Sequence, residues 1–129
     1  MPNFNEHIKT ASLITGIGGF FIDFVKQNQE VEMGLRAHVD AGEAFGKGMI
    51  CALGGAIGSM IPDKIDIPDN PNHRSHAHSF GSLILSGYIL ARDSLSENES
   101  GNLFLKSIVS GNGIHLLQDS QTSKGLNFL

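Results

Sequence analysis

The sequence predicts an all-α fold, a compact bundle of about four helices in one domain that spans residues 1–129. Apolar residues recur at helical spacing in four stretches, and no stretch alternates apolar and polar residues as a half-buried strand does. The length of 129 residues fits one average domain. No repeat of about 20 to 50 residues is visible, which excludes solenoid architectures.

The first helix is expected over about Asn5–Val25. Asn3 and Glu6 have the spacing of a capping box, in which each side chain bonds to the backbone of the other residue. A polar connector, Lys26–Gln29, is expected to follow. The apolar stripe of this helix contains Ile8, Leu13, Ile14, Ile17, Phe21, Phe24 and Val25.

A second helical region is expected over about Glu30–Met60, ended by Pro62, because proline disfavours helix at the residue before it. Small residues in a row let another helix approach closely, so we expect tight helix packing along this region and a contact between copies of the chain. We expect the histidine of the row to lie in the core or in an interface. The row, spaced every four residues, is Gly34, His38, Gly42, Gly46, Ile50, Gly54 and Gly58.

Two shorter helices complete the predicted bundle. A polar loop rich in proline, residues 62–79, leads to a third helix at about His76–Leu95. Asp93–Asn102 is expected to be a solvated connector. The fourth helix is expected at about Leu103–Asp119.

The net charge and the cysteine count exclude some kinds of partner and site. Thirteen acidic against nine basic residues give a net charge of −4, so no nucleic-acid partner is expected. Cys51 is the one cysteine, which excludes a disulfide within the chain and a thiolate metal site.

The apolar stretches are shorter than the roughly 20 apolar residues of a spanning helix, so we expect core helices with at most peripheral membrane contact. The beginning of the sequence lacks the basic region of a secretory signal. The expected location is therefore cytoplasmic or peripheral to the inner membrane. The stretches are Ala11–Val25, Met49–Ile61, Phe80–Ala91 and Leu103–Leu117.

Histidines and aspartates gather in four places that predict a metal site. Imidazole and carboxylate groups are ligands for zinc, iron or manganese. Each place also has an ordinary explanation, such as a surface histidine, a hydrogen-bonded helix pair or a solvated loop. The places are His7 in the first helix, Asp63 and Asp66 after the second, His73, His76 and His78 beside Arg74, and His115 four residues before Asp119.

Three segments in order resemble the membrane-bound metal-dependent hydrolase family (YdjM-like). They are Pro62-Asp63-x-x-Asp66-x-Pro68, His73-Arg74-x-x-x-His78-Ser79 and His115-x-x-x-Asp119-x-x-Thr122-x-x-Gly125. The family also has an early histidine, a place that His7 would fill. Ser75 stands where the family prefers glycine, and His76 is an additional imidazole.

The combined features predict a metal-dependent hydrolase that acts on a small-molecule or lipid phosphoester. Seven candidate ligands suit two divalent ions, zinc first with manganese or iron as alternatives. We expect Arg74 to bind phosphate and His76 to act as a general acid or as a further ligand. Ser79 and Thr122 would orient ligands. The expected ligands are His7, Asp63, Asp66, His73, His78, His115 and Asp119.

The alternative hypothesis is a protein without catalysis, in which the metal staples a structural or self-assembling bundle. The small size of the chain leaves little surface for a substrate pocket, which favours this alternative.

Overall fold

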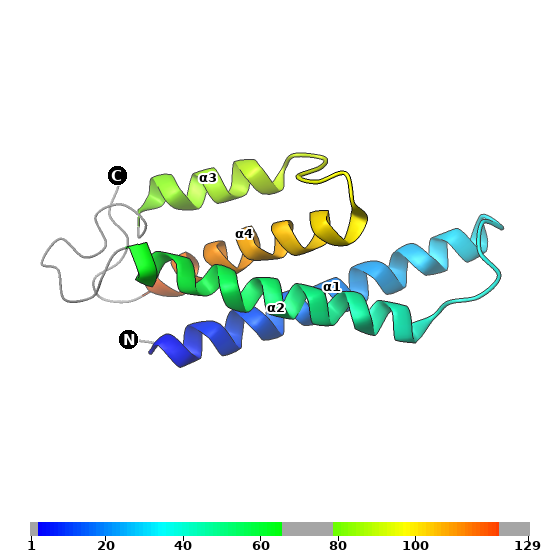
Figure 1. The fold of residues 1–129 in the computed structure, drawn as a ribbon, viewed down its shortest axis with the longest axis horizontal. Coiled ribbons are helices and arrows are strands. Elements are labelled where there is room, and N and C mark those ends of the chain that lie inside the picture. Colours follow the sequence, from blue (N-terminus) through cyan, green and yellow to red (C-terminus); the bar gives the residue numbers. More distant parts are fainter. Residues whose placement is uncertain (1–2, 66–78, 122–129) are drawn as a thin grey trace, which may run out of the picture.

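Four α-helices make up the regular structure of the chain. A computed structural model describes residues 3–65 and 79–121 (Figure 1). The predicted all-α bundle is confirmed, and the cluster of His7, His115 and Asp119 lies at one end of it. The helices are α1 (Phe4–Glu32), α2 (Ala41–Ile65), α3 (Phe80–Leu90) and α4 (Glu99–Ser120).

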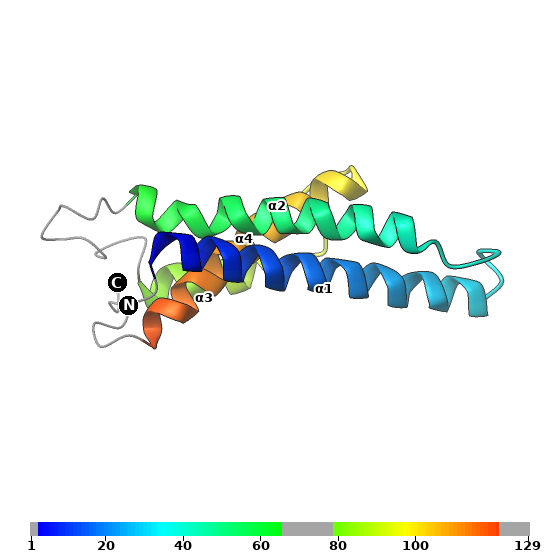
Figure 2. The ribbon, with the colours of Figure 1, turned by 90° about the horizontal axis from the view of Figure 1, so that it is seen from below.

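Successive helices alternate in direction along the bundle (Figure 1). Helices α1 and α2 form a long antiparallel hairpin, α4 packs against both, and within the described ranges α3 packs only against α4 (Figures 1 and 2). The start of α1 and the ends of α2 and α4 therefore meet at one end of the bundle, which we call the site end.

The turn between the first two helices lies later than the sequence suggested. The expected connector Lys26–Gln29 is helical, and α1 continues to Glu32. The chain turns at residues 33–40, where Gly34 has a φ of 72°, a conformation that favours glycine. The expected helix from Glu30 is therefore wrong at its start, and His38 lies exposed in the turn and not in the core of the chain.

The ends of the other helices also differ from expectation. Helix α2 continues past Pro62, which lies buried in the last turn and lacks the N–H that would bond to the Gly58 carbonyl. Helix α3 ends at Leu90 rather than Leu95. Helix α4 begins four residues early because Asn98 caps it, accepting a hydrogen bond from the Gly101 backbone N–H at 3.0 Å.

The interior of the bundle is made of small and polar side chains. Helix α1 buries every fourth residue. Within the described ranges, the fully buried apolar residues are Ala11, Ala44, Cys51 and Leu116. Thr15 donates a hydrogen bond to the Cys51 carbonyl across the α1–α2 contact at 2.8 Å. The buried row of α1 is His7, Ala11, Thr15, Gly19, Asp23 and Gln27.

The exterior carries the large apolar side chains, which is the reverse of the expected core. Leu13 is 64% exposed, Ile22 is 70% exposed and Ile84 is 71% exposed. The expectation that the apolar stretches fill a core is therefore wrong for these residues. By length and composition, α1 and α2 are each sufficient to cross a membrane, because the helices extend beyond the apolar stretches counted in the sequence.

Glycines set how closely three helices approach. A Cβ at Gly55 would come within 2.9 Å of the Ala11 carbonyl oxygen on α1. A Cβ at Gly111 of α4 would overlap the backbone of Gly55, and one at Gly58 would overlap the Ile108 carbonyl. Of the predicted row, Gly54 and Gly58 therefore make the expected close packing within one chain, whereas nothing lies within 4 Å of a Cβ at Gly34 or Gly46.

A cluster of ion pairs ties the helices together away from the site end. Lys47 contacts Asp23 at 2.6 Å and Glu99 at 3.3 Å, joining α1, α2 and α4. Lys26, with Lys47, holds the pKa of the Glu99 carboxyl below its usual range. Gln27 is 1% exposed and accepts a hydrogen bond from the Asp40 backbone N–H at 2.6 Å, which fixes the turn against α1.

Gly58→Ala should lower the free energy of unfolding by about 1–3 kcal/mol or more, because its Cβ would meet backbone that has no room to move. Gly46→Ala on the same helix should raise it by up to about 1 kcal/mol, since nothing lies within 4 Å of that Cβ and alanine favours helix. Denaturant titration of both variants measures the difference. Equal effects of the two substitutions would contradict the close approach of α2 and α4.

Candidate metal centre

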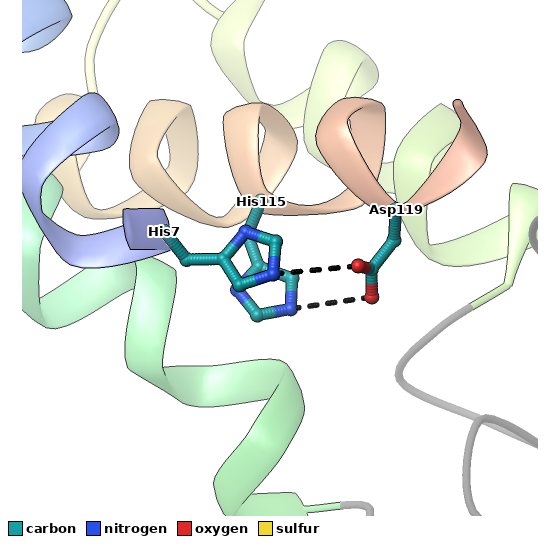
Figure 3. A group of neighbouring side chains, drawn as sticks. All are labelled: His7, His115 and Asp119. Atoms are coloured by element: carbon teal, nitrogen blue, oxygen red, sulfur yellow. Dashed lines mark ion pairs between the residues drawn. The ribbon is translucent and has the colours of Figure 1, made fainter. Parts of the chain in front are cut away.

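Three buried side chains converge at the site end (Figure 3). His7 Nε2 lies 3.4 Å from Asp119 Oδ1, and His115 Nε2 lies 3.5 Å from Asp119 Oδ2. The two imidazole rings are stacked with their centroids 4.0 Å apart. Both rings therefore present Nε2 to the same carboxylate, as the dashed lines in Figure 3 show.

The spacing of these atoms fits one metal ion. Each residue offers a ligand atom, and the three atoms lie within 4.8 Å of one another. Ligand atoms about 2.0–2.1 Å from a tetrahedral zinc ion lie roughly 3.4 Å apart, close to the 3.4 and 3.5 Å between the two histidine Nε2 atoms and the two carboxylate oxygens of Asp119. The group of His7, His115 and Asp119 could hold a metal ion.

Local helix structure positions each ligand. The capping box between Asn3 and Glu6 is present and begins α1, so that His7 lies in its first full turn facing the interior. His115 and Asp119 are four residues apart on α4 and share one face. All three are nearly inaccessible to solvent, with exposed fractions of 3%, 0% and 1% for His7, His115 and Asp119.

Gln118 sets the tautomer of His7. The Nδ1 atom of His7 lies 3.0 Å from Gln118 Oε1. An amide oxygen only accepts hydrogen bonds, so Nδ1 carries the proton and Nε2 keeps its lone pair for a metal. Gln118 is a site residue that the sequence interpretation missed.

Two aspartates lie close to His115 at the site end. The helices α2 and α4 both end here, and each carries an aspartate near its C-terminus, Asp63 and Asp119. The helix dipoles at this end oppose one another, because α1 and α3 begin where α2 and α4 end. Asp63 Oδ1 lies 3.7 Å from His115 Nε2, which places a second carboxylate beside the three-residue group.

Four of the seven expected ligands lie together at this end: His7, Asp63, His115 and Asp119. Ser79, expected to orient a ligand, is the N-cap of α3, where its hydroxyl accepts a hydrogen bond from the Ser82 backbone N–H at 3.1 Å. The remaining expected site residues lie outside the described residues. They are Asp66, His73, Arg74, His76, His78 and Thr122.

No family model, curated protein or solved structure matches this chain.

Zinc added to chelator-treated protein should bind saturably and stabilise the fold by about 2.7 kcal/mol at a hundredfold excess over Kd. Asp119→Asn should abolish this binding, because it removes the carboxylate shared by both imidazoles. Gln118→Leu should weaken it by about 10–100-fold, since His7 then loses the partner that fixes its tautomer. Calorimetric titration measures zinc binding by the wild type and by both variants.

His38→Ala is the matched control, because His38 is an exposed histidine in the turn at residues 33–40. Its affinity for zinc should equal that of the wild type. Unchanged zinc binding in Asp119→Asn would show that the three-residue group is not the metal site.

Proposed function

We propose that the chain is a metal-dependent hydrolase that cleaves phosphoesters at a membrane surface. The observation that carries the proposal is the donor set of two histidines and one aspartate within 4.8 Å. Catalytic zinc sites commonly use three such protein ligands and leave a position for water, whereas structural zinc sites are usually closed by four. The motif resemblance to the membrane-bound metal-dependent hydrolase family supports the same proposal.

Each residue at the site end has its own role in the proposed reaction. A bound divalent ion, zinc in this proposal, supplies a water of lowered pKa and neutralises charge on the phosphate oxygens. Asp63, beside His115, accepts the proton of the attacking water as the phosphorus–oxygen bond to the leaving alcohol breaks. In the proposal, Arg74 binds the phosphate and His76 protonates the leaving alcohol. Asp66, His73 and His78 then complete a second ion site.

The apolar exterior supports placing the bundle in a membrane. Each helix has a central segment free of charged residues, and on α1 and α2 these are residues 10–22 and 48–62. They span about 20 and 22 Å, less than the roughly 30 Å of a hydrocarbon core. Lysine stems at both ends and local thinning of the bilayer make up the difference. The three-residue group of His7, His115 and Asp119 then lies at one membrane boundary, where a lipid or soluble phosphoester can approach.

The burial of all three ligands favours a second candidate function, a metal staple without catalysis. His115 is 0% exposed and Asp119 is 1% exposed. A structural ion needs no access for substrate, so its ligands are free to be fully buried. In this case the ion holds α1 to α4, and its removal lowers stability.

Wild-type protein loaded with zinc should hydrolyse a chromogenic phosphodiester, and His115→Ala should reduce the rate to the uncatalysed background. His38→Ala should keep the wild-type rate. If neither the wild type nor any variant hydrolyses the substrate, and removal of the metal by a chelator lowers the melting temperature of the wild type, the metal has the structural function and not the catalytic one. Steady-state rates and thermal melts on the same samples separate the two functions.

The expressed chain should stay in the membrane pellet after alkaline carbonate extraction and should require detergent for release, because large apolar side chains cover its exterior. Immunoblots of the pellet and supernatant measure the partition. A monodisperse chain in the supernatant without detergent would contradict the membrane placement.

A further inference from the structure

We propose that the groove between α1 and α2 binds an acyl chain of an anionic phospholipid, with the lipid phosphate beside Lys9. This inference rests on the proposed function for its membrane setting, and it names the substrate class as a lipid phosphoester. The groove lies on the hairpin formed by the first two helices and has a volume of about 800 Å³. That volume lies within the range of about 300–1,000 Å³ found for small-molecule sites.

The groove follows from the small residues at the α1–α2 contact. A Cβ at Gly16 would come within 3.0 Å of the Ala52 Cβ, and one at Gly48 would come within 3.0 Å of the Gly16 carbonyl oxygen. The two backbones therefore approach closely at the floor of the groove. Leu13 on α1 and Met49 on α2, 64% and 58% exposed, line the groove as well.

The lining is polarised along its length. Its polar side chains are Lys9 and Ser12, on the part of α1 nearest the site end. Towards the other end the lining includes Phe20 and Phe45, which are wholly apolar. An amphiphile with a negative head and an apolar tail matches this arrangement, with its head at Lys9 and its tail towards the two phenylalanines.

Charge disfavours a second copy of the chain as the occupant. Two copies inserted in the same orientation and packed through this groove about a two-fold axis would present the same end of the groove to each other. Lys9 would then face the Lys9 of the partner, a like-charge contact that raises the free energy of association. An anionic lipid at the same place forms an attractive contact with the ammonium group.

Lys9 places the charged end of the groove at the same end of the bundle as His7. Lys9 is two residues from His7 on α1, so the two residues lie at nearly the same height along the helix, about 3 Å apart along its axis, but on opposite sides of it. An acyl chain held in the groove thus keeps the phosphoester of the same lipid near the site end.

Photocrosslinking in vesicles tests the groove directly. The full chain is placed in phosphatidylcholine vesicles that contain one of two probes, each with a diazirine in its acyl chain. One probe is phosphatidylglycerol and the other is phosphatidylcholine. The labelled residues are mapped by mass spectrometry. The phosphatidylglycerol probe should label residues 12–20 and 45–52 several-fold more than the phosphatidylcholine probe. Both probes should label the exposed face of α3 at Ile84 and Tyr88 equally.

Matched variants separate the head-group contact from the chain contact. Lys9→Gln should remove the preference for the anionic probe, whereas Lys64→Gln, an exposed lysine at the same end but outside the groove, should keep it. Met49→Trp should fill the groove and reduce labelling there, whereas Leu53→Trp should not. Met49 and Leu53 are 58% and 59% exposed, but only Met49 lines the groove.

Equal labelling by the two probes, or a preference that survives Lys9→Gln, would overturn the proposal, as would a crosslink between two copies through the groove. Photocrosslinking requires neither a bound metal ion nor hydrolysis of the lipid. The labelling preference should therefore persist in His115→Ala, and loss of hydrolysis alone leaves this inference standing.

Discussion

The contact of three helices at Gly55 is the constraint on which the rest of the structure depends. A side chain at this position would meet Thr15 and the Ala11 carbonyl on α1, and Gly111 of α4 packs against the same backbone. One turn beyond this contact towards the site end come His7, four residues before Ala11, and His115, four residues after Gly111. The glycine contact thus brings two histidines from opposite ends of the sequence into ring-to-ring contact.

The same small-residue packing explains the inverted distribution of polarity. Helices whose backbones touch through glycine, alanine and serine have no space between them for leucine or phenylalanine, so those residues face outward. In water this arrangement would forgo much of the free energy of apolar burial, whereas in lipid it would not. Among the described residues, the buried histidine and aspartate side chains lie near the two ends of α1, with His7, His115 and Asp119 at one end and Asp23, paired with Lys47, towards the other.

Local patterns in the sequence predicted local features well. The capping box at Asn3 and the four-residue spacing of His115 and Asp119 were both predicted, because each depends on neighbours within one or two turns. The turn at residues 33–40 was not predicted, since it depends on Gln27 bonding to Asp40 across thirteen positions. Gln118 was missed for the same reason: its contact with His7 joins residues 111 positions apart.

The most direct test is an X-ray absorption spectrum of the metal in protein purified without added metal. The proposed metal site predicts a divalent metal whose inner shell contains two imidazole nitrogens and carboxylate oxygen, in keeping with His7, His115 and Asp119. Replacing Gly55 with alanine should remove that signal while leaving every ligand in the sequence, because α1 would be pushed away from α2, against which α4 also packs. A protein without metal, or a shell without imidazole, would contradict the account.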